Sequence, residues 1–178
     1  MRVLVAITGA SGIQYGTRLA SALREMEGVD CNVVVSSGAK AVAEAEGAEL
    51  PMADYKENDF SSPYASGSNP PDAVVVIPCS LKTLGEISNG VGGSLITRAA
   101  EVALKERKKL ILVVRDTPYS LITIRNMETV TLAGGVVLPA SPGFYGKPKR
   151  IEDIYDFIVG RVLDQLGLEH NLGTRWKK

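Results

Sequence analysis

The sequence predicts an α/β fold, a single-domain doubly wound parallel sheet. Two observations support this prediction. Short, continuous apolar runs rich in β-branched residues recur along the 178-residue chain, which is typical of strands buried on both faces. Segments with helical spacing of apolar residues separate these runs, and such alternation indicates parallel strands joined by helices that cover the sheet.

The individual elements follow from these runs. Strands are predicted at 2–7, 31–35, 73–77, 110–114 and 135–139, and helices at 12–26, 94–106, 121–133 and 151–167, with a further helix ending at Glu46. Residues 51–72 carry four of the nine prolines, so they are predicted to form a long loop over the site. Residues 168–178 are predicted to be a C-terminal tail of the same domain, which spans 1–178.

Composition excludes several function classes. The 20 basic and 20 acidic side chains cancel, which disfavours a nucleic-acid partner. No apolar window is long enough to predict a membrane span, so a cytoplasmic location is expected. Cys31 and Cys79 lie in predicted strands and are interpreted as free thiols. The single histidine, His170, lies in the polar tail, which argues against a histidine metal site or a Ser-His-Asp triad.

Small polar residues follow four of the predicted strands. The segments are "TGASG" (8–12), "SSGAK" (36–40), "PCSLKT" (78–83) and "RDTP" (115–118). The first is a glycine turn before a helix, where backbone N–H groups can form an anion site. Because ligands of such sheets bind at the carboxyl ends of the strands, the four segments predict a crevice for a phosphate and a flat polar ring.

A nicotinamide cofactor is the first alternative for this crevice. The glycine spacing lacks the G-x-G-x-x-G pattern, and serines follow the second strand where an acidic residue would bind the ribose. The Tyr-x-x-x-Lys pair of short-chain reductases has a counterpart in Tyr145 and Lys149, but Gly146 and Pro148 interrupt it and a helix would not accept them. The sequence therefore disfavours NAD.

Eight ordered motifs cover nearly the whole chain. They are "TGASGxxYG" (8–16), "ASGS" (65–68), "PCSxKTL" (78–84), "TRAAEVALKERKKL" (97–110), "VRDTP" (114–118), "PxxPGFYxxP" (139–148), "DFxVxRxLDxLG" (156–167) and "RW" (175–176). By these motifs the chain resembles the UbiX-like flavin prenyltransferases, in a wider group of homo-oligomeric flavoproteins that includes cysteine decarboxylases. The resemblance implies a Rossmann-like or flavodoxin-like sheet.

The resemblance also implies an activity. Such enzymes transfer a dimethylallyl group from dimethylallyl monophosphate to reduced FMN without a metal, and the prenylated FMN serves UbiD-like decarboxylases. The family is dodecameric and shares its site between subunits. The sequence leaves open whether the donor is the monophosphate or the diphosphate. A cysteine decarboxylase and a non-catalytic FMN carrier stay as alternatives; the first would place a histidine beside the flavin, and the second would not need a second phosphate site.

Site residues are carried over from the motifs. Those implied to bind FMN are Gly9, Ala10, Ser11, Ser36, Ser80, Leu81, Lys82, Thr83 and Arg115. Those implied to bind the prenyl donor are Tyr145, Arg161, Arg98, Lys105, Phe60, Ser66 and Trp176. Those implied to be catalytic are Ser11, Glu46 and Asp116.

Some of these residues have a second interpretation or depart from the family. Arg161 can pair with Asp164 across one helical turn. Asp116 stands where the family commonly has Glu, which shortens the reach of the carboxylate by one methylene. Phe60 stands where the family commonly has Trp, which weakens its cation–π face.

Overall fold

Six parallel strands form one sheet in the order β3-β2-β1-β4-β5-β6, which confirms the predicted fold class. The structure is a computed structural model that describes residues 1–176, so the last two residues of the predicted tail lie outside it. The strands are β1 (Arg2–Ile7), β2 (Asp30–Val35), β3 (Tyr55–Lys56), β4 (Ala73–Cys79), β5 (Lys109–Val114) and β6 (Val136–Val137). Without the short edge strand β3, the order is that of a flavodoxin-like sheet.

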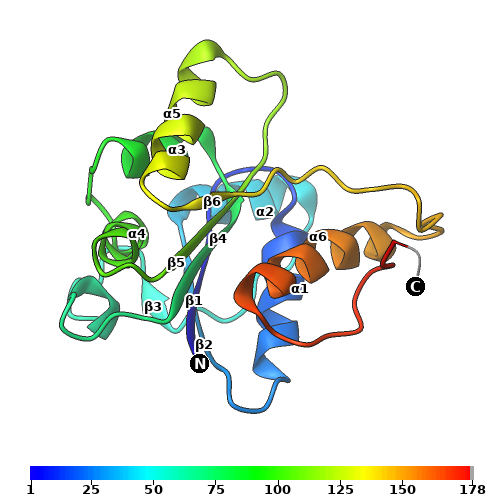
Figure 1. Ribbon diagram of the computed structural model, residues 1–178, viewed down its shortest axis with the longest axis horizontal. Coiled ribbons are helices and arrows are strands. Elements are labelled where there is room, and N and C mark those ends of the chain that lie inside the picture. The colour runs from blue at the N-terminus through cyan, green and yellow to red at the C-terminus, as the bar shows by residue number, and fades with distance from the viewer. Residues whose placement is uncertain (177–178) are drawn as a thin grey trace.

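Helices cover both faces of the sheet (Figure 1). One layer consists of α1 (Ile13–Arg24), α2 (Ser37–Glu46) and α6 (Ile151–Leu166). The other consists of α3 (Leu81–Ser88), α4 (Leu95–Lys105) and α5 (Leu121–Leu132). The two layers explain why the strands read as continuous apolar runs, since side chains on both faces are buried.

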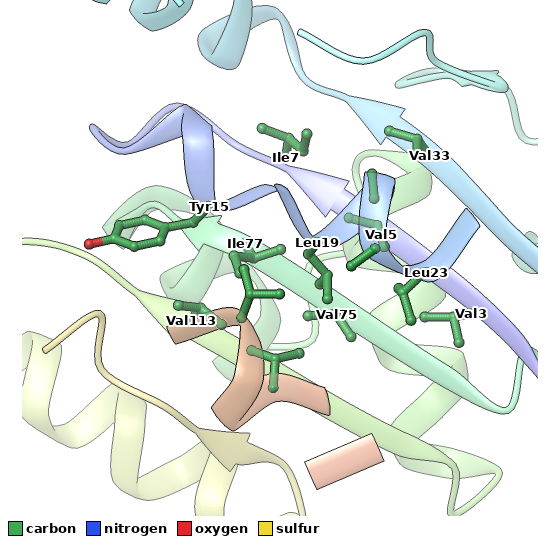
Figure 2. Close-up of a cluster of buried hydrophobic side chains, with 14 of the residues drawn as sticks. Val3, Val5, Ile7, Tyr15, Leu19, Leu23, Val33, Val75, Ile77 and Val113 are labelled. Carbon is green, nitrogen blue, oxygen red and sulfur yellow. The ribbon is translucent and has the colours of Figure 1, made fainter. Parts of the chain in front are cut away.

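Strand β1 illustrates this two-sided burial. Its odd-numbered residues Val3, Val5 and Ile7 pack against the layer of α1 and α6, and Leu4 and Ala6 pack against the opposite layer. All five are fully buried. Figure 2 shows the first group packed beside Leu19 and Leu23 of α1, with the hydroxyl of Tyr15 directed away from the cluster.

Three predicted segments differ from the structure. The last predicted strand, 135–139, shortens to Val136–Val137, and an additional helix, α3, follows β4. The loop 51–72 contains β3 and a 3-10 turn, η1 (Pro63–Ala65), in which Tyr64 is buried because it packs into the core beside α4. The tail folds back along α6 (Figure 1). The His170 side chain in this tail is only 3% exposed, so the polar sequence around it did not indicate its burial.

Both cysteines are free thiols, as expected. Cys79 is fully buried, and Cys31 is half-buried at the start of β2. Burial raises the pKa of Cys31 to about 11. A thiol with such a pKa is a poor nucleophile near neutral pH.

Two further properties concern residues 1–176. Over that range, the helices all fall short of the length and apolar character that crossing a membrane requires. The same residues contain no group of three or more His, Cys, Asp or Glu side chains that could hold a metal ion.

Candidate functional site

The carboxyl ends of β1 and β4 meet at the point where the strand order reverses. Ligands of open α/β sheets bind outside this point. The hydroxyl of Thr8, directly after β1, accepts the Ser80 N–H at 2.9 Å and donates to the Pro78 carbonyl at 2.8 Å. These bonds fix the two strand ends relative to each other and so define the floor of the site.

A first cavity of about 280 Å³ lies over this floor. Its lining residues come from the segments after β1, β2, β3 and β4 and from the start of α4, and are Gly9, Ser36, Ser37, Gly38, Glu57, Ser80, Leu81, Lys82, Thr83, Glu86, Ser94 and Ile96. Gly9 lies directly against Gly38, since a Cβ on Gly9 would lie 3.0 Å from the Gly38 carbonyl carbon. The cavity thus brings together six of the nine residues implied to bind FMN.

Two helices begin at this cavity, each capped by a serine. The Ser36 hydroxyl oxygen accepts the Ala39 N–H at 3.0 Å, and the Ser80 oxygen accepts the Thr83 N–H at 3.2 Å. The polar strand ends therefore have a structural role in addition to the predicted ligand role. Capping uses an acceptor site of the oxygen, so the Ser36 hydroxyl can still donate to a ligand.

A second cavity of about 400 Å³ lies on the other side of the Gly9–Gly12 turn. It is lined by Ser11, Gly12, Gln14, Tyr15, Glu46, Arg115, Ala140 and Tyr155. The rings of Tyr15 and Tyr155 meet edge to face with centroids 5.5 Å apart, and they form its aromatic wall. Ser11, Glu46 and Arg115, all implied by the resemblance, are thus brought together.

The start of α1 is occupied by a carboxylate from the protein itself. Glu46 Oε1 accepts the Gly12 N–H at 2.9 Å, and Oε2 accepts the Ile13 N–H at 3.4 Å. Gly12 adopts φ +92°, in the left-handed region that favours glycine, which turns its amide toward Glu46. The predicted anion site at this helix is therefore filled by Glu46, and it is not free for a phosphate group.

Opposing effects determine the pKa of Glu46. Partial burial raises the pKa. Hydrogen bonds from the Ser11 side chain and from the amides of Gly12 and Ile13, together with the charge of Arg115, lower the pKa by more than burial raises it. The net pKa lies below the ordinary value of 4.5. Glu46 is therefore an ionised carboxylate at neutral pH, in contact with the Ser11 hydroxyl.

Asp116 and Ala10, which are next in sequence to the lining residues Arg115 and Ser11, lie at the margin of the site. Asp116 is exposed, and its Oδ1 accepts the Thr117 N–H at 2.7 Å, which shapes the turn after β5. Ala10 is 8% exposed and lies within the turn between the two cavities. Neither residue lines the first or the second cavity.

A third cavity of about 400 Å³ lies between α6 and the returning tail. It is lined by Tyr145, Phe157, Gly160, Arg161, Asp164, His170, Leu172, Gly173, Thr174, Arg175 and Trp176. The rings of Tyr145 and Trp176 pack edge to face with centroids 5.2 Å apart. Arg161 pairs with Asp164 at 2.5 Å, as the alternative interpretation expected, yet it stays half exposed with further donors available.

Three other residues implied to bind the prenyl donor, Ser66, Arg98 and Lys105, lie in the opposite layer. The "ASGS" turn that contains Ser66 packs on α4, where Arg98 donates to the Ala65 carbonyl at 3.0 Å and pairs with Glu101 at 2.8 Å. Lys105 pairs with Glu106 at 2.5 Å. One chain therefore brings Ser66, Arg98 and Lys105 together but does not bring them to the third cavity beside α6.

Phe60 is 50% exposed in the loop that precedes η1. It is not among the residues that line the three cavities. Its predicted contact with the prenyl donor therefore needs either a movement of this loop or a neighbouring chain.

The lining residues that were not predicted from the sequence include the polar and aromatic side chains of Tyr15, Glu57, Tyr155, Asp164, His170 and Arg175. Glu57 accepts the Ser37 N–H at 2.8 Å at the start of α2, a contact across a loop that no local pattern indicates. Asp164 and Arg175 lie within two of the eight sequence motifs, so the motifs already indicated these two residues. Tyr155 was indistinguishable from the core positions of α6.

Comparison with known proteins gives consistent matches. The flavoprotein family model matches residues 1–163. The flavin prenyltransferase UbiX of Methanocaldococcus jannaschii is 46% identical over 183 residues, covering 99% of this chain and 98% of that protein. The crystal structure of AnUbiX (PadA1) in complex with FMN and dimethylallyl pyrophosphate is 43% identical with a TM-score of 0.94, covering 99% of this chain and 97% of the other.

A further structure matches over the full length of both chains. It is a dodecameric FMN-dependent UbiX-like decarboxylase from Escherichia coli O157:H7, 39% identical, with a TM-score of 0.93 and 100% coverage of each chain. The match therefore extends over the residues that line all three cavities, and not only over the sheet.

Proposed function

This chain belongs to the flavoprotein family and, within it, to the UbiX flavin prenyltransferases, and we propose that it transfers a dimethylallyl group from a dimethylallyl phosphate to reduced FMN. One structural observation supports this activity in addition to the family membership. A crevice with hydroxyl and amide donors at the strand ends coexists in this chain with a separate cavity that combines aromatic rings and guanidinium groups. The enzyme thus has places for two phosphorylated molecules.

The first and second cavities fit FMN. Gly9 lines the first cavity where a Cβ would lie 3.0 Å from the Gly38 carbonyl carbon, and the amides at the start of α3 precede its first intrahelical bonds and can donate to a phosphate. We propose that Ser36 and Ser80 to Thr83 hold the phosphate side and that Ser11 and Arg115 hold the ring side. When bound, reduced FMN supplies the nucleophilic ring that receives the dimethylallyl group.

The third cavity fits the prenyl donor. Loss of the phosphate leaves a delocalised allylic cation and a phosphate dianion, so the site has to stabilise both charges. Arg161 and the Tyr145 hydroxyl are proposed to bind the phosphate through charge-assisted hydrogen bonds. The faces of Tyr145 and Trp176 are proposed to stabilise the cation.

Glu46 and Ser11 are proposed to handle the proton that the alkylated ring must lose. The Glu46 carboxylate is ionised and in contact with the Ser11 hydroxyl, so it can accept a proton directly or through Ser11. Asp116, on the exposed turn after β5 and next in sequence to Arg115, is proposed to assist with its carboxylate.

A homo-oligomer with shared sites is proposed, supported by two observations. Within one chain, Arg98 and Lys105 lie on the opposite side of the sheet from Tyr145 and Arg161, so a second copy is needed to bring these four residues together. Four large apolar side chains of α5 are also exposed: Leu121, Ile122, Ile124 and Leu132. The E. coli relative is described as dodecameric.

The alternatives are less well supported by the geometry. A cysteine decarboxylase would place a histidine beside the flavin, but His170 lines the third cavity and is held by Asp164 at 3.1 Å. A simple FMN carrier would not need a second, aromatic cavity with guanidinium groups. A similar structure from Aquifex aeolicus is named a phenylacrylic acid decarboxylase, so release of carbon dioxide from phenylacrylic acid is the control reaction.

The direct test is anaerobic incubation of the protein with reduced FMN and dimethylallyl monophosphate. Mass spectrometry is expected to show a flavin heavier by one dimethylallyl group, and the diphosphate is tested in parallel. Unmodified FMN with both donors would contradict the proposal. We further propose that the product serves a UbiD-like decarboxylase, to be tested by activation of such an apoenzyme with the reaction mixture.

A further inference from the structure

Three donors converge on the carboxylate of Asp164. Arg161 Nη1 lies 2.5 Å from Oδ2, and Arg175 Nη2 and His170 Nε2 lie 2.8 and 3.1 Å from Oδ1. The Leu172 N–H donates to His170 Nδ1 at 3.1 Å, so Nδ1 is the acceptor and Nε2 carries the proton that is donated to Asp164. One carboxylate therefore fixes two guanidinium groups and one imidazole.

The tail reaches this carboxylate because it packs directly on α6. A Cβ on Gly160 would lie 2.8 Å from the Leu172 carbonyl oxygen and 3.0 Å from His170 Cε1, so glycine is needed where the chain crosses the helix. The crossing buries His170 and returns Arg175 and Trp176 to the part of α6 that carries Arg161. In Figure 1 the tail runs back along α6 toward its first turns.

The charges of the third cavity do not cancel. Arg161 and Arg175 line it with Asp164, which is the one acidic residue in its lining. Burial raises the pKa of Asp164, but hydrogen bonds from His170 and Arg175 and the charges of both arginines lower it below its ordinary value. The carboxylate is thus ionised, and the two guanidinium groups leave one positive charge beside the aromatic rings.

Both guanidinium groups have further N–H groups that can donate hydrogen bonds to a ligand. The Arg161 and Arg175 side chains are 51% and 43% exposed, and the bonds to Asp164 use only part of the five N–H groups of each. Two guanidinium groups held on one carboxylate present a fork suited to the several oxygens of a phosphate monoester. An uncharged ligand would not need the second guanidinium.

We propose that Arg175 is a second phosphate-binding residue for the prenyl donor, beside Arg161, and that Asp164, held by His170, is the positioning residue for both. This inference rests on the proposed function, because it assigns the phosphate of the donor to the third cavity. Fixing both guanidinium groups before the donor arrives avoids the entropy of ordering two long side chains during binding.

The test uses calorimetric titration of dimethylallyl monophosphate into the enzyme loaded with oxidised FMN, which needs no turnover. Arg175→Gln is expected to weaken binding about tenfold, the usual effect of losing one charged hydrogen bond. Asp164→Asn is expected to weaken it to a similar extent, and the double variant by less than the product of both effects. FMN affinity is expected to stay unchanged in all three.

Arg150→Gln is the matched control, since it removes an exposed guanidinium that pairs with Asp153 three residues along the same helix but does not line the third cavity. Arg175→Lys keeps the charge without the fork and is expected to bind with intermediate affinity. Unchanged donor affinity in Arg175→Gln overturns the phosphate role. A lower melting temperature of Asp164→Asn with unchanged donor affinity overturns the positioning role.

Failure of the proposed function has a different signature. A wild-type protein that binds dimethylallyl monophosphate with the expected dependence on Arg175, but yields only unmodified FMN when reduced, contradicts prenyl transfer and supports the phosphate site. A wild-type protein that prenylates FMN while Arg175→Gln keeps full donor affinity contradicts the phosphate site alone.

Discussion

Glu46 Oε1 lies 2.9 Å from the backbone nitrogen of Gly12, and this contact joins the end of α2 to the start of α1. It places a negative charge at the positive end of the α1 dipole, where anions are stabilised. The same carboxylate faces the cavity that contains Ser11 and Arg115. Separate experiments can therefore distinguish the structural role of Glu46 from its proposed chemical role.

The chemical role predicts that Glu46→Gln slows prenylation by about 10²- to 10⁴-fold, the usual range for loss of a general base. Glutamine keeps the size and an acceptor oxygen, so FMN binding is expected to persist. Single-turnover kinetics and FMN absorbance measure the two effects. Since the pKa of Glu46 lies below 4.5, the midpoint of any loss of wild-type rate through protonation of Glu46 should lie below pH 4.5. A variant with an unchanged rate would exclude Glu46 as the base.

The structural role predicts a pH-dependent stability difference. The pKa of Glu46 is lowered in the folded state, so its contribution is fully present above the unfolded value of 4.5 and is lost as the pH falls through the folded pKa. The melting temperature of Glu46→Gln should thus lie below that of the wild type near neutral pH, and the difference should shrink in acid. Glu44→Gln, an exposed change on the same helix, is the control and should show no such trend.

Gly16 provides a test of packing between α1 and the sheet. A Cβ at this position would clash with the Ile77 carbonyl oxygen and would lie 2.8 Å from Ile7 Cγ1. Gly16→Ala is therefore expected to lower the free energy of unfolding by about 1–3 kcal/mol, although alanine favours helix. Gly93→Ala, where a Cβ meets nothing within 4 Å, is the control. Denaturant titration of both variants measures the effect, and equal stability would show that α1 can shift away from β4.

The sheet and its main helices were predictable because burial on both faces leaves continuous apolar runs and clear helical spacing. Glycines of the first turn were recognised as a motif, but only the structure shows that Gly9 approaches Gly38 and that Glu46 fills the helix start. Contacts of this kind join residues far apart in sequence, so spacing does not indicate them. The burial of His170 in the tail was not predictable, because a single histidine among polar residues has no periodic pattern.

Tyr145 and Arg161 are expected to act on the donor and not on FMN. Both line the third cavity, and neither lines the cavities assigned to the flavin. Tyr145→Phe and Arg161→Ala should raise the KM for the prenyl donor, with a loss of roughly 2–4 kcal/mol in transition-state stabilisation for Arg161→Ala. FMN affinity, measured by fluorescence quenching, should be unchanged. Loss of FMN from either variant would instead place that residue in the flavin site.

The exposed apolar surface of α5 predicts self-association through this helix. Ile122 and Leu132 are 72% and 82% exposed, and α5 projects from the edge of the molecule (Figure 1). Exposed apolar patches of this kind mark interaction surfaces. The double variant Ile122→Asp, Leu132→Lys is expected to reduce the molar mass measured by light scattering. Met52→Lys, which alters an apolar side chain that is 78% exposed but lies outside α5, should leave it unchanged.

The same double variant also tests whether the site is shared. If Arg98 and Lys105 reach the third cavity only from a second copy, dissociation should lower kcat/KM for the prenyl donor at low protein concentration, while the circular dichroism spectrum of the folded chain persists. High protein concentration should restore part of the activity by mass action. Full activity in a variant that stays monomeric would show that one chain is sufficient, and that Arg98 and Lys105 act outside the donor site.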